Sequence, residues 1–266
     1  MLGPRAVSEG YRLAAFDQIG STNAEAMARA RKGEAGPVWL VTTEQTAGRG
    51  RRNRPWIAPR GNLASSILEV MDTSPLAAAT LGFAAGLAAQ RALRTVCAEA
   101  PRANRQDRTD FVLKWPNDVL AGGNKLVGIN LEAETVSGER LAVVVGIGTN
   151  VVGAPEGTPT PATSLAALGF QVTAEALFAQ LSDAWAEFRG VWDNGRGFAE
   201  IRKSWMAGAV GLGQPVAIRS GSVTIEGTFE TLDEQGCMIV RTPEGRRIPI
   251  TAGDVHFGSA ASARAT

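Results

Sequence analysis

Residues 43–56 read TEQTAGRGRRNRPW, and this stretch decides how the rest of the chain is interpreted. It holds four arginines, and no acidic residue occurs between Glu44 and Glu69. Apolar runs at residues 38–41 and 62–71 flank it, so we expect a loop that joins two buried strands. Arginine forks bind phosphate and carboxylate oxygens, and ligand sites gather where loops leave a sheet. The stretch therefore predicts an anion-binding loop.

Two other interpretations of this loop stay open from its composition alone. Runs of arginine often form a solvated surface, and clustered arginine is also typical of proteins that bind nucleic-acid backbone. The chain as a whole carries a formal net charge of +1, which argues against a general polyanion binder. We therefore favour a local site for a small anion.

The composition limits the class of protein. A chain of 266 residues can hold one large domain, or a large and a small one. Cys97 and Cys237 lie far apart without metal-ligand spacing, which predicts a reducing, cytoplasmic location. The single histidine, His256, argues against catalytic pairs and zinc sites built on histidine. The longest apolar segment, residues 76–93, is interrupted by polar residues and glycine, so we expect no membrane-spanning helix.

The hydrophobic pattern predicts alternating strands and helices in the first two thirds of the chain. A capping box formed by Thr22 and Glu25 predicts an alanine-rich helix with Thr22 as its N-cap. Ser74 and Pro75 predict the start of one long helix that ends near Cys97. Apolar residues at helical spacing after Thr173, which include Trp185 and Trp192, predict a core-facing helix, and a further helix is expected at 197–207. The expected strands are 11–19, 38–44, 62–71, 111–115, 126–134 and 141–145.

A second informative stretch, residues 111–129, reads FVLKWPNDVLAGGNKLVGI and holds two of the few lysines, Lys114 and Lys125. Its Pro-Asn-Asp and Gly-Gly-Asn sequences predict a turn and a hairpin turn. We therefore expect the two lysines on adjacent strands, with Asp118 between them. The alternative is that each lysine ends a strand at the surface, but Lys114 lies between two apolar residues in a chain that otherwise prefers arginine.

The run that begins at Leu141 ends in Gly146-Ile147-Gly148-Thr149-Asn150. The third glycine and the helix of a dinucleotide fingerprint are missing. We therefore expect a strand whose glycines let another group approach closely, with the Asn150 amide available for hydrogen bonds.

From Gly213 onward the pattern changes to short strands, expected at 215–219, 223–230, 236–241 and 246–250. They predict a small all-β, barrel-like domain. A domain of about 45 residues needs docking to a larger one to be stable. The last residues, 258–266, are expected to fray.

Five motifs in this order and spacing resemble the bacterial biotin–protein ligases: Ser21-Thr22-Asn23, Gln45-Thr-Ala-Gly-Arg-Gly-Arg51, Lys114-Trp-Pro-Asn-Asp118, Lys125-Leu-Val-Gly128 and Gly146-Ile-Gly-Thr-Asn150. The resemblance covers about residues 11–257, and the second and third motifs together are highly specific. It implies an α/β (α+β) fold. Residues 1–210 would form a mixed-sheet catalytic domain of the biotin/lipoyl ligase, class II synthetase-like type, residues 211–258 an SH3-like β-barrel, and residues 259–266 a disordered tail.

The same resemblance implies a two-step reaction. Biotin and MgATP give biotinyl-5′-AMP and pyrophosphate, and a lysine of a biotin carboxyl carrier protein then attacks the mixed anhydride and releases AMP. The carrier would belong to acetyl-CoA carboxylase or a related carboxylase. Because few residues precede the first expected strand, the resemblance is to the monofunctional type without a DNA-binding domain. A cytoplasmic monomer or homodimer without DNA or membrane partners is expected, with Mg²⁺ bridged by the phosphates.

The resemblance assigns site residues by motif. The implied catalytic residues are Lys114, Arg51 and Asp118. The implied biotin-binding residues are Ser21, Thr22, Asn23, Gln45, Gly48, Arg49, Gly50, Arg51, Lys125 and Gly128. The implied ATP-binding residues are Arg51, Arg54, Trp56, Lys114, Asn117, Lys125 and Asn150. The basic loop would close as a lid that protects the adenylate from water. Asn53, Pro55 and Asn130 depart from the usual pattern, which bears on loop flexibility and local packing.

Two alternatives accompany this interpretation. A lipoate or octanoate ligase-like enzyme would share the fold, but Gln45 and the Gly-Arg-Gly-Arg sequence suit a ureido group better than a dithiolane. A nucleic-acid-binding module with a basic loop and a small barrel is the alternative from another class.

Overall fold

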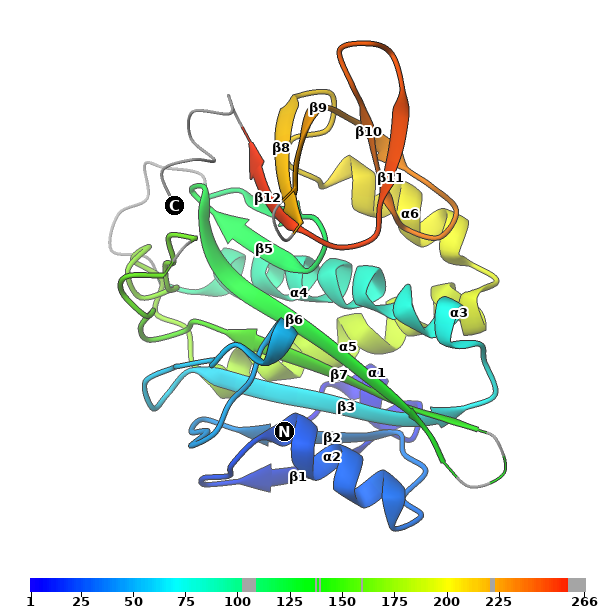
Figure 1. Cartoon of the computed structure of the whole chain (residues 1–266). Coiled ribbons are helices and arrows are strands. Elements are labelled where there is room, and N and C mark those ends of the chain that lie inside the picture. The colour runs from blue at the N-terminus through cyan, green and yellow to red at the C-terminus, as the bar shows by residue number, and fades with distance from the viewer. Residues whose placement is uncertain (102–108, 137, 139, 159, 221–222, 258–266) are drawn as a thin grey trace.

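The computed structural model describes residues 1–101, 109–136, 138, 140–158, 160–220 and 223–257 (Figure 1). The tail expected at 259–266 and most of the segment between residues 101 and 110 lie outside the described residues. The elements before the second sheet are α1 (Pro4–Ser8), β1 (Arg12–Phe16), α2 (Thr22–Arg31), β2 (Val38–Thr42), η1 (Arg51–Asn53), β3 (Leu63–Met71), α3 (Pro75–Ala79), α4 (Leu81–Glu99), β4 (Phe111–Lys114), β5 (Asp118–Ala121), β6 (Asn124–Thr135), β7 (Leu141–Thr149), α5 (Ala174–Trp192), η3 (Asp193–Gly195) and α6 (Phe198–Ala207).

A mixed sheet of seven strands forms the larger part of the molecule, in the order β1-β2-β3-β7-β6-β5-β4. β1 and β2 run parallel, and the other neighbouring strands are antiparallel. This confirms the α/β class with a mixed sheet. The strand that crosses the middle, β7, pairs with β3 on one side and with β6 on the other, so the two informative stretches leave neighbouring parts of one sheet.

Each face of the sheet is covered by helices because its strands alternate (Figure 1). Val38 and Leu40 of β2 pack with Ala26 and Met27 of α2 on one face. Trp39, between them, belongs to the larger core on the other face, where α4 and α5 lie. The Trp39 ring meets the Trp185 ring edge to face at 6.0 Å between centroids. The expectation that the tryptophans of α5 are core residues is confirmed.

The helix expected from Pro75 to Cys97 is divided in the structure. α3 ends at Ala79, α4 begins at Leu81, and Thr80 lies between them. The Thr80 hydroxyl donates to the Ala77 carbonyl and accepts from Trp192 Nε1 at 2.7 Å, so the break gives a buried indole its partner. The segment Pro75–Glu99 has the length and apolar character of a membrane span, but 72% of its most apolar window is buried inside the fold. It is a core helix.

The second sheet has five antiparallel strands in the order β11-β10-β9-β8-β12, formed by β8 (Pro215–Ser220), β9 (Val223–Leu232), β10 (Met238–Arg241), β11 (Arg247–Ile250) and β12 (Asp254–Phe257). This agrees with the SH3-like barrel. Its interior, with Phe229 and Met238 fully buried, is continuous with the main core. Trp115 Nε1 donates to the Gly236 carbonyl at 3.0 Å in a buried contact. The barrel is therefore docked through shared apolar surface and a buried hydrogen bond.

Candidate active site

A cavity of about 590 Å³ lies at one end of the seven-stranded sheet. It is bounded by the start of α2, the basic loop, the turn between β4 and β5, the loop around residues 155–162 and the edge of the barrel. All of the site residues implied by the resemblance line this cavity except Gly48. Segments more than 100 residues apart in sequence thus meet at one site.

Gly48 has a structural place in the basic loop instead of a place in the cavity wall. A Cβ on Gly48 would lie 2.7 Å from the Trp56 carbonyl oxygen and 2.8 Å from Gln45 Nε2. Contacts this short exclude any side chain. Gly48 therefore lets the two ends of the loop pass one another, and its expected contact with biotin does not follow from the cavity lining.

The start of α2 differs from the expected capping box. The N-cap is Ser21, whose hydroxyl accepts from the Ala24 amide, and Thr22 is the first helical residue. Thr22 is buried, and its amide and hydroxyl donate to Gln45 Oε1 at 2.8 and 3.2 Å. The Thr22 hydroxyl is committed to a tertiary contact, so the preceding serine caps the helix. The helix start and the basic loop are joined by these bonds.

The glycines of β7 let two side chains, those of Asn23 and Trp56, approach the strand closely, as expected. A Cβ on Gly146 would lie 2.3 Å from Asn23 Oδ1, and one on Gly148 would lie 2.6 Å from the Trp56 ring. Asn23 also donates to Glu132 Oε1 at 2.8 Å, which fixes the orientation of its amide. Gly128 of β6 lies opposite Gly148, and a Cβ there would be 2.8 Å from the Trp56 ring. The indole therefore rests directly on a floor of two glycines.

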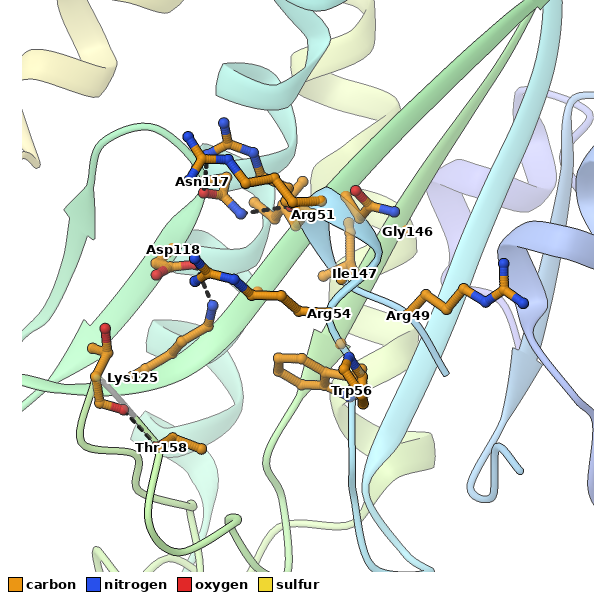
Figure 2. A pocket seen from close by; sticks show the side chains of 18 of the residues that line it. Arg49, Arg51, Arg54, Trp56, Asn117, Asp118, Lys125, Gly146, Ile147 and Thr158 are labelled. Carbon is orange, nitrogen blue, oxygen red and sulfur yellow. Dashed lines mark hydrogen bonds and ion pairs between the residues drawn. The ribbon is translucent and has the colours of Figure 1, made fainter. Parts of the chain in front are cut away.

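The basic loop folds back on itself over the cavity. The Gly50 amide donates to the Arg54 carbonyl at 2.8 Å, and the Trp56 amide donates to the Gly48 carbonyl at 2.9 Å. At the tip, Arg52 and Asn53 have φ of 55° and 59°. Asparagine tolerates this left-handed region better than most residues, so Asn53 suits its position. Figure 2 shows the Arg51 and Arg54 side chains extending toward Asn117 and Asp118, whereas Arg49 extends in the opposite direction.

Asn117 ties the basic loop to the turn after β4. Arg51 Nη1 donates to Asn117 Oδ1 at 2.9 Å. The other end of the Asn117 side chain donates to the Ile129 carbonyl at 2.8 Å, and the Ile129 amide donates to the Asn117 carbonyl at 2.9 Å. An amide held on both sides places the Arg51 guanidinium over the cavity.

Lys114 and Lys125 lie on β4 and β6, which are separated by β5, so the expectation of adjacent strands was wrong. The Pro-Asn-Asp turn returns the chain as a short strand of its own, and Asp118 is its first residue. Asp118 stands opposite Lys114 in the β4–β5 pair. Its Oδ1 forms an ion pair with Lys125 Nζ at 2.6 Å, with both side chains largely shielded from solvent. Asp118 therefore lies between the two lysines, as expected.

Asn150 lines the cavity and is buried. Its Nδ2 donates to the Thr163 carbonyl at 3.0 Å, which anchors the loop that follows residue 153. Asn62 supports the same loop by accepting from the amides of Val151 and Val152, each at 2.9 Å. The Asn150 amide is thus partly used by the protein itself.

The electrostatic character of the cavity is strongly basic. Among the described residues that line it, the acidic side chain is Asp118, and the Lys and Arg side chains are Arg49, Arg51, Arg52, Arg54, Lys114, Lys125 and Arg219. Within the described residues, no three His, Cys, Asp or Glu side chains gather as they would around a metal ion. The arrangement suits a multiply charged anion.

One part of the cavity wall carries no local signal in the sequence. Arg219, Gly253, Val255 and His256 of the barrel line the cavity together with residues of the first sheet. Their local pattern is that of ordinary barrel strands, and only the docking of the barrel brings them to the site. Ile129 and Ile147, which give the cavity apolar walls, were also not singled out.

Comparison with known proteins assigns the chain to a class. Residues 16–150 match the biotin/lipoate A/B protein ligase family, and residues 211–258 match the biotin protein ligase C-terminal domain. The chain belongs to the biotin/lipoate A/B protein ligase family.

The chain is also similar to individual proteins of this family. The chain is 40% identical over 244 residues to a biotin–[acetyl-CoA-carboxylase] ligase of Paracoccus denitrificans, covering 90% of this chain and 97% of the relative. It is 35% identical over 243 residues to the ligase of the same name from Mycobacterium tuberculosis, covering 90% and 86%. The biotin protein ligase of Aquifex aeolicus in complex with biotin and ATP superposes with a TM-score of 0.73 at 25% identity, covering 93% and 99%.

Proposed function

We propose that this protein activates biotin with ATP to biotinyl-5′-AMP and transfers the biotinyl group to a lysine of a biotin carboxyl carrier protein. The observation that carries the proposal is one cavity in which the polar start of α2 opens onto Arg51, Lys114 and Lys125. A ligase that joins a carboxylate to a phosphate needs a polar end that binds the acid and a cationic end that binds the phosphate. The match of residues 211–258 to the biotin protein ligase C-terminal domain favours biotin over lipoate or octanoate.

The ureido ring of biotin would lie at the start of α2. This end of the cavity offers the Ser21 hydroxyl and the Gln45 amide nitrogen between the apolar walls of Ile129 and Ile147. The Thr22 hydroxyl, whose proton is donated to Gln45, would take part there as an acceptor. A ureido group has both donors and acceptors, and a site that pairs them rejects an analogue without them strongly. The Gln45 side chain is already oriented by Thr22, which supports recognition of a defined pattern.

The first step would take place between the ureido end and Lys114. A carboxylate oxygen of biotin attacks the α-phosphorus of ATP, the bond from that phosphorus to the β-phosphate oxygen breaks, and pyrophosphate leaves with the bond's electron pair. Both reactants are anions, so fixed positive charge must offset their repulsion. Arg51 and Lys125 would hold the carboxylate and the α-phosphate, and Lys114 would stabilise the charge that develops at the reacting centre.

The adenine would lie beside the Trp56 ring and Asn150. The indole is held over the glycine floor with Lys125 Nζ 5.7 Å from its centroid, so one face is fixed by the protein. Aromatic faces bind bases by stacking. Arg54 and Asn117 lie on the phosphate side of this position.

ATP would enter as its magnesium complex. Phosphate oxygens are the usual partners of Mg²⁺, which rarely uses an all-protein cage, and the described part of the cavity wall offers Asp118 already paired with Lys125. When bound, the ion would neutralise phosphate charge, and the residues of this chain would orient the phosphates.

In the second step the amine of the carrier lysine attacks the acyl carbon, the acyl carbon–oxygen bond breaks, and AMP leaves. Asp118 is the acidic side chain in the described wall, so we assign it the proton that the amine loses.

We further propose that the catalytic part spans residues 1–210 and the SH3-like part residues 211–258. The chain has two cysteines that are far apart in sequence and lack metal-ligand spacing, and on this ground we place the reaction in the reducing cytoplasm.

The decisive experiment is pyrophosphate release from ATP on addition of biotin, compared with lipoate. We expect release with biotin and none with lipoate, followed by biotinylation of an added carrier domain. Absence of pyrophosphate release with biotin would refute the assignment, and pyrophosphate release with lipoate alone would favour the lipoate alternative.

A variant tests the lid. Arg51→Gly removes the side chain that bonds Asn117, so the adenylate should escape and biotinylate lysines of unrelated proteins. The readout is biotinylation of bovine serum albumin, detected by streptavidin blotting. If the variant retains the adenylate as tightly as wild type, the lid role is wrong.

A further inference from the structure

A chain of buried hydrogen bonds lies behind the start of α2. Ser66 of β3 is fully buried and is not among the residues that line the cavity. Its hydroxyl oxygen lies 2.7 Å from the Thr22 hydroxyl oxygen and 2.6 Å from Asn23 Oδ1. On one side the Thr22 hydroxyl donates to Gln45 Oε1 at 3.2 Å. On the other side Asn23 Nδ2 donates to Glu132 Oε1 at 2.8 Å. The chain therefore joins the cavity wall to a carboxylate on β6.

The contacts of the Asn23 amide allow it only one orientation. Its nitrogen faces Glu132 Oε1 and, at 3.3 Å, the Asn130 carbonyl oxygen. An ionised carboxylate and a carbonyl can only accept hydrogen bonds, so the amide nitrogen must point at them. The amide oxygen then points at Ser66, where it can only accept. Asn130 Nδ2 donates to the same Glu132 oxygen at 3.0 Å and helps to hold the carboxylate. Both ends of the Asn23 amide are therefore engaged within the protein.

The Gln45 amide is fixed at the opposite end of the chain. Its Oε1 accepts from the Thr22 backbone amide at 2.8 Å, and a backbone N–H can only donate. The oxygen of Gln45 must therefore face Thr22, and the Thr22 hydroxyl can reach it only as a donor. The chain thus ends in an acceptor on both sides, with the hydroxyls of Thr22 and Ser66 between them.

The hydroxyl protons are too few for the contacts that they serve. Three oxygen–oxygen contacts run along the chain, and the two hydroxyls within it hold one proton each. The Thr22 proton is held by Gln45, and Ser66 shares its single proton between the Thr22 oxygen and Asn23. Neither proton is left for a ligand. The Thr22 oxygen therefore meets a ligand only as an acceptor, and it is short of a donor until one arrives.

We propose that Ser66 and Glu132 are positioning residues that make this end of the cavity select a ligand with an N–H group at Thr22. This inference rests on the proposed function and deepens it, because each ureido nitrogen of biotin carries an N–H. One of them completes the hydrogen bonds of the chain. A ring without an N–H, such as a dithiolane, leaves the buried Thr22 oxygen short of its donor. Ser66 and Glu132 act through Thr22 and Asn23 and do not touch the ligand themselves.

The test uses variants that break the chain and variants that keep it. Ser66→Ala and Glu132→Ala each remove one link, whereas Glu132→Gln keeps an acceptor oxygen for Asn23. Glu132 is exposed, so its variants leave the buried core intact even if Ser66→Ala fails to fold. Ser182→Ala is the matched control, because Ser182 of α5 is also fully buried. Its hydroxyl accepts from the Gly3 amide at 2.9 Å, away from the cavity.

Three measurements separate the role of the chain from general packing. The first is the Kd for biotin by isothermal titration calorimetry, and the second is the KM for ATP in pyrophosphate release. The third uses two analogues of biotin, each methylated at one ureido nitrogen, whose Kd values are measured by competition with biotin. Methylation removes one N–H, so the analogue methylated at the nitrogen that faces Thr22 cannot complete the chain.

Loss of a buried hydrogen bond should raise the Kd for biotin roughly tenfold in Ser66→Ala and about threefold in Glu132→Ala. Glu132→Gln and the control should bind biotin as wild type does, and the KM for ATP should be unchanged in every variant. One of the two analogues should bind the alanine variants of Ser66 and Glu132 as tightly as it binds wild type, because it gives the chain no proton.

An unchanged Kd for biotin in both Ser66→Ala and Glu132→Ala overturns the inference. An equal loss of affinity for biotin and for both analogues also overturns it, since the variants would then have disturbed packing and not the supply of protons. Absence of biotin-dependent pyrophosphate release in the wild type would instead refute the proposed function itself.

Discussion

The Trp56 ring rests on two glycines, and a single added methyl group tests the proposed adenine site. In Gly148→Ala the new Cβ would lie 2.6 Å from Cε2 and 2.8 Å from Cζ2 of Trp56. Carbon atoms in contact are normally about 3.5–4.0 Å apart, so the ring must move by about 1 Å. Neither β7 nor β6 can yield easily, because Gly148 lies opposite Gly128 within continuous antiparallel pairing.

The displaced ring should weaken ATP binding and leave biotin binding nearly unchanged. Stacking of an aromatic ring on a base contributes about 1–3 kcal/mol. Loss of about half of this, roughly 0.5–1.5 kcal/mol, corresponds to about a two- to tenfold rise in the KM for ATP. The assay is biotin-dependent pyrophosphate release at varied ATP concentration. Isothermal titration calorimetry with biotin alone reports the other end of the cavity.

Gly82→Ala is the matched control, because a Cβ at Gly82 of α4 meets nothing within 4 Å. This variant should keep the wild-type KM and gain about 0.5–1 kcal/mol of stability, since alanine is the better helix former. If Gly148→Ala keeps the wild-type KM for ATP, or if it weakens biotin and ATP binding equally, the assignment of Trp56 to the adenine is refuted.

Three further outcomes follow from the structure. Trp115→Phe leaves the buried Gly236 carbonyl without its donor, so urea denaturation should show a loss of about 1–3 kcal/mol in the free energy of unfolding. Trp192→Phe is the comparison, because it removes the donor to a Thr80 hydroxyl that still donates to Ala77. Asn117→Ala removes the Asn117 acceptor of the Arg51 guanidinium and should increase escape of biotinyl-AMP, measured as biotinylation of albumin, without a change in the biotin Kd. Burial, followed by the charge of Glu69, raises the pKa of Tyr11 far above its ordinary 10.0, so the unfolded chain ionises first. The contribution of the neutral Tyr11 phenol to the free energy of unfolding should therefore be fully present below pH 10. Above pH 10 it should fall by up to about 1.4 kcal/mol per pH unit. Tyr11→Phe should remove this slope, and a slope equal to that of wild type would contradict the burial argument.

The periodic parts of the sequence predicted the fold well, because one face of each element is buried. The strands before and after the basic loop were placed within two residues of β2 and β3, and α5 buries Trp185 and Trp192 as expected. Where two local rules compete, the pattern was insufficient. Ser21 and Thr22 both suit an N-cap, and only the tertiary contact from Thr22 to Gln45 decides between them.

The residues of the candidate site also divide into those that the sequence could predict and those that it could not. Motifs that lie within one stretch, such as the basic loop and the turn after Lys114, could be placed from the sequence because turn residues and strand ends are local signals. The spacing of the two lysines could not, since a four-residue strand, β5, is too short to show a period of two and was not predicted as a strand of its own. Insertion of β5 puts Asp118 opposite Lys114 by register, and the Lys125 side chain reaches Asp118 as an ion pair. Neither relation can be read from the linear sequence.

The barrel wall lies beyond local signals altogether. Arg219 and His256 occupy alternating positions of strands whose other side chains fill the barrel core, so the pattern explains them fully as exposed strand residues. What turns this face toward the cavity is the continuity of the barrel core with the main core and the Trp115 bond to Gly236. A small domain that cannot bury enough surface alone must dock, and here the docking also brings Arg219 and His256 to the cavity wall. The same interface therefore stabilises the barrel and completes the cavity, so its two roles cannot be read from the strand pattern of the barrel alone.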